Sequence, residues 1–281
     1  MRTIRYCPTG ELNTGVSLCP VDFKHIKGAI LVEENDILST GFTEDDLEKW
    51  CHGKGPNHVM PIKGFVDYAK EGGEAQVNAN GYGASVFSGL SQQTDTFTLD
   101  RFYPELHAAL LKAVNYKFGV YYYTKDNVII GLNNGVGALK PIPVTLVPNA
   151  TPLPSSGGNP TQTVGFAYQD TEYVHKHYDY MKVGFTIENH LIGLVPVLLQ
   201  KDANNKWHVI EAIGGLDRTA EYGSALAGSG SAVVPAASTI TYANGVLTIT
   251  LASGQTDADV KLVDSATLYD NDVFGIVQWK E

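Results

Sequence analysis

The sequence predicts a mainly β protein of antiparallel strands with two short helices. Three observations support this fold class. Apolar and polar residues alternate over short runs, the period of a strand with one buried face. The 29 glycines and 13 prolines recur between these runs as turn residues. The pair Asn244-Gly245 separates two such runs, and Asn-Gly accepts the positive φ angles of the type I′ turn that joins hairpin strands.

The composition narrows the class of protein. The 281 residues are 43% hydrophobic and 18% charged, which excludes overall disorder because disorder requires low hydrophobicity and high charge. Lys and Arg number 20 against 30 Asp and Glu, a net charge of −10. A protein that grips nucleic-acid phosphates carries the opposite sign, so this class is excluded.

Two helices are expected. The first spans Glu44–Cys51, with Thr43 as N-cap and acidic residues at the positive end of the helix dipole. The second spans about 104–114, and Pro104 suits its first turn. Its apolar residues recur at helical spacing and should pack on one face of a sheet: Leu106, Ala109, Leu110, Ala113 and Val114.

Strands account for most of the remaining chain. Residues 118–132 predict a hairpin that turns at Lys125-Asp126-Asn127. Alternation also predicts strands at 164–168 and 181–187, and we place His175-Lys176-His177 on a strand as well. Two further hairpins are expected, one joining 194–199 to 207–210 and one joining 240–242 to 247–251.

Three segments lack apolar periodicity and are expected to be surface loops, or arms that a partner orders: 72–83, 148–163 and 223–238. The expected domains are a β-sandwich over 1–190 and a smaller β domain over 191–281. If this boundary is misplaced, 192–210 would belong to the sandwich.

The start of the chain, its hydropathy and its cysteines predict the compartment in which the protein folds. No apolar run follows Met1 that could act as a secretory signal, and no run of about 18 apolar residues predicts a membrane span. Three cysteines, Cys7, Cys19 and Cys51, do not suggest a disulfide framework. We therefore expect a soluble protein that folds in a reducing cytoplasm.

The histidines are the strongest candidates for metal ligands, but neither group of them makes a complete ligand set. His175 and His177 would share a face of a strand, but no third ligand can be assigned. Cys51-His52 with His58 matches no usual zinc spacing. No serine lies in a nucleophile elbow. We therefore predict no catalytic residue, no metal site and no cofactor.

The order of elements over 64–132 is more informative. Gly64-Phe65-Val66-Asp67-Tyr68 precedes a glycine-rich excursion, then the strand Thr96-Phe97-Thr98-Leu99, the helix near Pro104 and the hairpin from Val120. This order resembles the tail-tube class of bacteriophage structural proteins and the related tail-ring proteins. In that class a β-sandwich carries one packed helix.

The resemblance implies a virion structural protein that self-assembles into a ring or tube and is not an enzyme. Its partners would be copies of itself, adjacent tail or head-connector proteins, and DNA that passes through the lumen without sequence-specific binding. It would be assembled in the host cytoplasm. A net charge of −10 suits such a conduit, because carboxylates repel phosphates.

Extended arms that pair with a neighbouring sheet edge would join the copies. The residues expected in these arms lie in the first two loop segments: Gly72, Gly73, Glu74, Asn80, Gly81, Pro152, Pro154 and Pro160. Deleting either arm should impair ring formation more than folding.

Two other functions fit parts of the sequence. Fifteen tyrosines, many on predicted strands, suit a carbohydrate-binding or surface-adhesion β module, although the missing secretion signal weighs against it. A metal-dependent enzyme using His175 and His177 is the third hypothesis. Glycan binding and metal content would distinguish these two from the assembly hypothesis.

Overall fold

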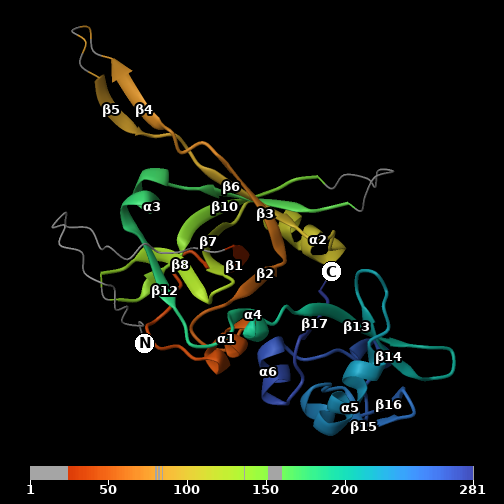
Figure 1. Cartoon of the computed structure of the whole chain (residues 1–281). Helices are drawn as coiled ribbons and strands as arrows, with labels where there is room; N and C mark the ends of the chain where they lie inside the picture. The colour runs from red at the N-terminus through yellow and green to blue at the C-terminus, as the bar shows by residue number, and fades with distance from the viewer. Residues whose placement is uncertain are drawn as a thin grey trace. The chain divides into compact units, whose positions relative to one another are not determined.

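The computed structural model describes residues 25–79, 81, 83, 85–135, 137–150 and 160–280 (Figure 1). The protein is mainly β, as predicted, with 41% strand and 21% helix. The described residues contain six α-helices, α1 to α6, rather than the two expected. The chain divides into two compact units. The first unit contains the described residues up to Glu44 and those of Met60–His190. The second contains Asp45–Val59 and the described residues from Leu191 onward.

The first unit is built on one ten-stranded antiparallel sheet. Its central path runs β12-β8-β7-β10-β11-β6-β3; β1 pairs with β2 and β7, and β9 pairs with β8. The strands are β1 (Ile26–Glu33), β2 (Met60–Lys63), β3 (Phe65–Glu71), β6 (Thr94–Leu99), β7 (Lys117–Thr124), β8 (Val128–Asn133), β9 (Leu139–Lys140), β10 (Ile142–Pro148), β11 (Thr163–Tyr168) and β12 (Tyr178–Lys182).

Strand β7 lies at the centre of this sheet. One of its edges pairs with β1, while the other pairs with β10 near its start and with β8 near its end. Its residues from Gly119 to Thr124 are all buried. Because this strand is covered on both faces, it reads as a continuous apolar and aromatic run rather than as an alternating one. The predicted hairpin at 118–132 is confirmed.

The sheet of the first unit curls around a single core. Strand β2 continues through Gly64, at φ +82°, directly into β3, so the chain joins two strands that lie at opposite ends of the sheet. The inward residues of these strands form one cluster that includes Leu31, Phe97 and Phe166. Burying such apolar side chains stabilises the fold by about 1.5–3 kcal/mol each.

The helix α2 (Pro104–Lys112) packs on this core as predicted. Leu110 is buried in the cluster, and Leu106 and Ala113 are partly buried against it. Ala109 is exposed, so the buried stripe is narrower than expected. The helix also ends at Lys112, two residues before its predicted end.

Two strand predictions in the first unit were wrong. Residues 171–177 form a helix, α3 (Thr171–His177), because the Asp170 side chain accepts a hydrogen bond from the Tyr173 N–H and caps its start. The strand expected at 181–187 ends at Lys182, and α4 (Ile187–His190) follows. The Asn127 side chain accepts from the Ile187 N–H at 3.2 Å, which turns the chain out of the sheet.

The second unit contains a separate, curled five-stranded mixed sheet. Its order is β15-β16-β14-β13-β17, and only the β13–β17 pair is parallel. The strands are β13 (Val195–Lys201), β14 (Trp207–Glu211), β15 (Ala237–Ala243), β16 (Val246–Leu251) and β17 (Ile276–Gln278). The helices are α1 (Glu44–Cys51), α5 (Thr219–Ser229) and α6 (Ser265–Asp270), with 3₁₀ turns at Gly230–Ala232 and Asp257–Asp259.

Both predicted hairpins of the second unit are confirmed. Asn244 and Gly245 have φ angles of +52° and +77°, the signs that a type I′ turn requires, and they join β15 to β16. The segment 223–238, expected to be a loop, instead holds most of α5. Its helical character was hidden because Ala, Gly and Ser replace larger apolar residues. A Cβ at Gly223 would lie 2.4 Å from the Tyr242 ring, so close packing requires the glycine.

The segment Asp45–Val59 belongs to the second unit, although it lies far from the rest of that unit in sequence. The imidazole of His52 is fully buried, and its Nε2 accepts a hydrogen bond from the Gly275 N–H at 3.1 Å. The Ser265 hydroxyl donates to the His52 carbonyl oxygen at 2.9 Å. Lys54 pairs with Asp270. These contacts connect the helix α1 and the turn after it to the C-terminal elements.

Candidate functional site

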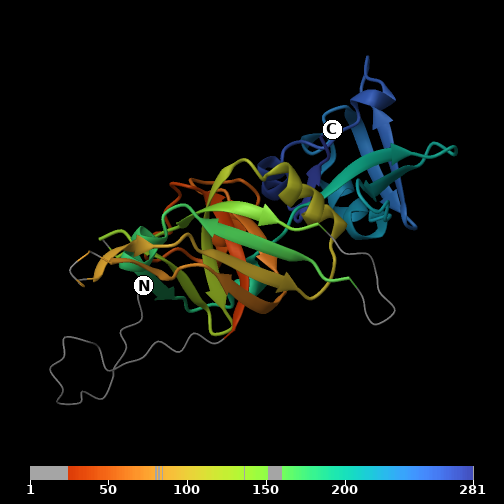
Figure 2. The ribbon, with the colours of Figure 1, turned by 90° about the horizontal axis from the view of Figure 1, so that it is seen from above.

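The feature that stands apart from both cores is a two-stranded ribbon, β4 (Ala75–Ala79) and β5 (Ser85–Leu90), which we call the arm. It continues the direction of β3 and β6 and projects from the sheet of the first unit (Figure 1). Figure 2 shows the arm beyond the end of that sheet from a second direction. An isolated two-stranded ribbon is at best marginally stable in water.

The arm carries an apolar face that is largely exposed. Its register places Val77 opposite Phe87 and Ala75 opposite Leu90, so these side chains share one face. Val77 and Phe87 are each 55% exposed. Gln76 and Asn78 lie on the other face, together with Val86 of β5, which is 50% exposed. The arm therefore exposes apolar side chains on both faces, without a core beneath it.

The arm is also uncharged. No Asp, Glu, Lys or Arg occurs from Ala75 to Thr94, in a chain that is 18% charged overall. Proteins protect exposed strand edges with charges, especially Lys, or with Pro. Neither occurs on β4, and β4 pairs with β5 alone among the described strands. An exposed apolar ribbon that lacks these protections is typical of a surface that another chain covers.

The base of the arm is sharply defined. Gly72 and Gly73 have φ angles of +74° and +80°, and a Cβ at Gly72 would lie 1.9 Å from the Gln92 carbonyl oxygen. The Ser91 hydroxyl donates to the Glu74 carboxylate at 2.9 Å and accepts from the Glu74 N–H at 3.1 Å. These contacts hold the junction between the arm and the sheet in one geometry.

Below this junction lies a buried carboxylate, Asp95, which is 4% exposed. Its Oδ1 accepts hydrogen bonds from the Tyr68 hydroxyl at 2.9 Å and from Gln93 Nε2 at 2.8 Å. Its Oδ2 accepts from the Tyr168 hydroxyl at 2.5 Å. Gln93 Oε1 in turn accepts from His175 Nε2 at 2.8 Å. The cluster ties β3, β6, β11 and α3 together where the arm begins.

Burial near Asp95 raises the pKa of the tyrosine side chains around it. Desolvation, then the charge and hydrogen bond of Asp95, raise the pKa of Tyr168 far above its ordinary value. Desolvation also raises the pKa of Tyr178 to about 12, with the Asp95 charge as the second cause. Both hydroxyls therefore stay protonated well into the alkaline range, and that of Tyr168 donates to Asp95. With three hydrogen bonds to its two oxygens, Asp95 is a satisfied buried carboxylate.

The residues expected in the arms fall in different places. Gly72, Gly73 and Glu74 form the base of the arm, and Gly81 lies in its tip. Asn80, Pro152 and Pro154 lie outside the described residues. Pro160 is half-buried before β11. The segment 72–83 was expected to be a loop or an arm, and it contains the strand β4. Its function as an arm stays a prediction.

The paired histidines do not converge. Because α3 is a helix, residues two apart point in different directions, and the expectation that His175 and His177 share a face was wrong. His177 Nδ1 donates to the Tyr173 carbonyl oxygen at 2.8 Å. Within the described ranges, no group of three or more His, Cys, Asp or Glu side chains is placed to hold a metal ion.

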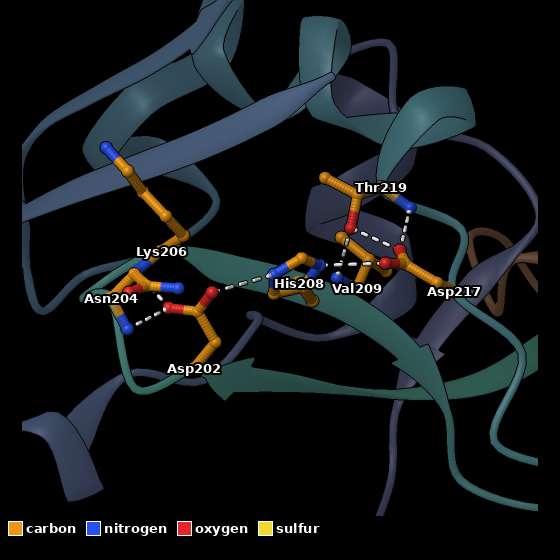
Figure 3. A network of polar contacts seen from close by, with 7 residues as sticks. All are labelled: Asp202, Asn204, Lys206, His208, Val209, Asp217 and Thr219. Carbon is orange, nitrogen blue, oxygen red and sulfur yellow. Dashed lines mark hydrogen bonds and ion pairs between the residues drawn. The ribbon is translucent and has the colours of Figure 1, made fainter. Parts of the chain in front are cut away.

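A second polar network lies in the other unit (Figure 3). His208 Nδ1 donates to Asp217 at 2.7 Å, and its Nε2 lies 3.8 Å from Asp202. The other Asp217 oxygen accepts from the Thr219 N–H and hydroxyl, at 2.8 Å and 2.5 Å. Asp202 accepts from the Lys206 N–H at 2.7 Å and closes the β13–β14 turn.

This network fixes two turns. A hydrogen bond from the Lys206 backbone lowers the pKa of Asp202 below its ordinary value. Burial alone would raise the pKa of Asp217, but hydrogen bonds from Thr219 and His208 hold it below that value. The His208 Nε2 faces a carboxylate instead of a nucleophilic hydroxyl or thiol, so the arrangement is not a catalytic triad.

The residues that define the arm were not identified from the sequence. Val77 falls within the expected loop 72–83 because the alternation in Ala-Gln-Val-Asn-Ala is short, and Phe87 falls in no predicted element. The uncharged run from Ala75 to Thr94 is a signal that could have identified the segment. Asp95 carried no local signal, since two of its three partners, Tyr68 and Tyr168, come from strands that are distant in sequence.

No helix among the described residues is long and apolar enough to cross a membrane. Compared with known proteins, the chain matches no family model and no curated protein sequence.

Proposed function

We propose that this protein is a structural subunit of a bacteriophage tail tube or tail ring, which self-assembles through the arm into a channel for DNA. The observation that carries the proposal is the arm itself. It exposes apolar side chains, Val77 and Phe87 on one face and Val86 on the other, and it carries no charge over its whole length. Association would bury its apolar face and extend its two strands into a larger sheet.

The fold supports the same proposal. The order β6, α2, β7, β8 is the strand–helix–hairpin order from which the resemblance to tail-tube proteins was drawn. We also propose that the first unit is a β-sandwich of tail-tube type with a packed helix. The curled sheet of the first unit and the contact of Leu110 with its core are consistent with it.

Charge supports a conduit for DNA. A net charge of −10 disfavours adhesion of phosphates, so DNA could slide through a lumen lined by such subunits. We propose that the partners are copies of this chain and adjacent tail or head-connector proteins. The location would be the virion, after assembly in the host cytoplasm. The proposed role is structural rather than enzymatic and requires no cofactor.

The test compares two variants that each add one positive charge to an exposed strand position. Val77→Lys places the charge on the arm, and Thr241→Lys places it on β15 of the second unit. Negative-stain electron microscopy and sedimentation velocity should show rings or tubes for wild type and Thr241→Lys. Val77→Lys should remain smaller, since a desolvated charge in an interface is strongly unfavourable.

Salt dependence gives an independent measure. The arm carries no charge, whereas whole copies repel each other at a net charge of −10. Screening should therefore promote assembly between low salt and about 0.5 M, where the Debye length falls to only a few Å. A wild-type protein that stays monomeric at high concentration and at every salt concentration would refute the proposed function.

A further inference from the structure

We infer that the arm of one copy docks, through the face that carries Val77 and Phe87, on a different surface of the first unit of the next copy. This acceptor surface, which we call the α2 end, is marked by Leu111, Tyr116 and Val147. The inference rests on the proposed function and names the surface that the arm binds. Each copy has one arm, so assembly beyond a pair requires a heterologous contact, which joins two different surfaces.

The arm and α2 lie at opposite ends of β6. The arm leads into the start of β6 at Thr94, whereas the end of β6 at Leu99 leads to α2. Both views of the ribbon show the arm and α2 on opposite sides of the first sheet (Figure 1 and Figure 2). Head-to-tail contacts between two such surfaces can continue from copy to copy, because every added copy brings a new arm and a new acceptor.

The α2 end exposes large apolar side chains from three elements. Leu111 lies in the last turn of α2, Tyr116 directly precedes β7, and they are 50% and 64% exposed. Val147, near the end of β10, is also exposed. Thr145 of β10 pairs with Lys117 of β7, so the end of β10 lies beside the start of β7. Exposed apolar side chains that several elements contribute are typical of a surface that a partner covers.

The charges around the two surfaces are complementary. Carboxylates outnumber cations beside the base of the arm, on β3, α3 and the turn before β4: Glu71, Glu74, Asp170 and Glu172 against Lys70 and Lys176. Cations outnumber carboxylates around the α2 end: Arg101, Lys112 and Lys117 against Asp100 and Glu105. In a chain of net charge −10, this difference favours arm-to-α2 contacts over other orientations. Exposed ion pairs contribute little affinity, so salt should still promote assembly.

The two ends of the ten-stranded sheet are less suitable acceptors. On β3, the Asp67 carboxylate accepts a hydrogen bond from the Tyr68 N–H at 2.9 Å. On β12, the Asp179 carboxylate accepts from the Tyr180 N–H at 2.9 Å. These N–H groups already have acceptors, and charged side chains on an edge strand oppose pairing with another chain. The arm therefore docks through its face, and its strand edges stay available for the sheet extension that the proposed function includes.

Carbodiimide cross-linking of wild-type assemblies tests the contact directly, because this reagent condenses a carboxylate with an amine that touches it. A glutamate at the base of the arm, Glu71 or Glu74, should be joined to a lysine of the α2 end. That lysine should be Lys112 or Lys117, identified by mass spectrometry of the digested product. Assemblies mixed from unlabelled and heavy-isotope-labelled copies should give linked peptides of mixed label, which form only between copies. The unassembled fraction should lack the link.

Charge variants test the same contact by complementation. Leu111→Glu places a carboxylate in the acceptor and should abolish rings and tubes, as Val77→Lys does, whereas Ala109→Glu on the same helix should assemble like wild type. Leu111 and Ala109 are both exposed, so circular dichroism should show an unchanged fold. Well above the concentration at which wild type assembles, a mixture of Leu111→Glu and Val77→Lys should sediment as pairs of twice the monomer mass and nothing larger. Each variant keeps one of the two surfaces intact, so only one contact can form.

The outcomes separate this inference from the proposed function. If wild type assembles but Leu111→Glu also does, or if the assemblies give no link between the base of the arm and the α2 end, the arm docks elsewhere and only this inference fails. A mixture that stays monomeric, when both variants fail to assemble alone, would also overturn it. If wild type never assembles, the proposed function fails, whatever the variants do.

Discussion

Replacing Asp95 with alanine should destabilise the first unit and leave the second unchanged. Asp95 is 4% exposed and accepts three hydrogen bonds, from Tyr68, Gln93 and Tyr168. Removing the carboxylate leaves these donors without their acceptor. A buried donor that loses its partner incurs the full cost of its desolvation.

The magnitude follows from the burial of each donor. Tyr68 is 47% exposed, so its hydroxyl can return to water and contributes little. Gln93 and Tyr168 are 3% and 2% exposed, and hydrogen bonds to a charged group contribute about 1.5–3 kcal/mol each. Removing a buried charge recovers part of its desolvation energy. We therefore expect Asp95→Ala to lower the free energy of unfolding by about 3–5 kcal/mol.

The distribution of aromatic residues allows each unit to be followed separately. The three tryptophans, Trp50, Trp207 and Trp279, all belong to the second unit, whereas most of the 15 tyrosines belong to the first. In urea titrations of Asp95→Ala, the tyrosine transition in near-ultraviolet circular dichroism should move lower by roughly 1–3 M. The tryptophan fluorescence transition should not move.

The matched control is Asp126→Ala, which removes an exposed carboxylate from the turn between β7 and β8. It should change stability by less than about 0.5 kcal/mol. Asp95→Asn keeps one acceptor oxygen and should lose only about 1–2 kcal/mol. If Asp95→Ala unfolds within about 1 kcal/mol of wild type, the cluster does not stabilise the base of the arm and this reasoning is refuted.

Three further predictions concern pH and the second unit. Burial raises the pKa of Tyr122 and Tyr168 above 10 in the folded state, so their contribution is complete below pH 10. Above pH 10, the free energy of unfolding should fall by about 1.4 kcal/mol per pH unit for each hydroxyl. An alkaline titration followed by tyrosine circular dichroism that shows no loss of stability would contradict this. The pKa values of Asp202 and Asp217 are lowered in the folded state, so their contribution is present above pH 3.8 and is lost as the pH falls below it. In urea titrations followed by tryptophan fluorescence, the transition of the second unit should therefore move to lower urea as the pH falls below 3.8, and His208→Ala should weaken this pH dependence. His52→Ala should lower the stability of the second unit by about 2–4 kcal/mol, because it opens a cavity and removes two buried hydrogen bonds. An unchanged tryptophan transition would refute that prediction.

The elements that the sequence predicted correctly carry their information locally. Asn244-Gly245 determines a hairpin because its backbone tolerates positive φ, whatever surrounds it. The helix α2 was predicted because Pro104 fixes its start and Leu106 and Leu110 recur at helical spacing. Turn chemistry and periodicity act over a few residues, so they can be recognised without the fold.

The errors occurred where distant contacts decide the structure. His175 lies in a helix that is capped by Asp170 and packs through Val174, and its short sequence has no clear period. Gly223 occurs in α5 because the Tyr242 ring leaves no room for a larger side chain. Short, small-residue helices of this kind depend on tertiary packing, which overrides weak local propensity.

The sequence by itself determined the β-rich class, the hairpins and the position of α2, because strand alternation, turn residues and apolar spacing are local properties. The expectation of an arm near Gly72 also came from sequence. Only the tertiary structure showed that this segment is an exposed ribbon anchored above Asp95, and that Asp45–Val59 joins the C-terminal elements. Burial and long-range hydrogen bonds decide these features, because they depend on residues that are distant in sequence and close in space.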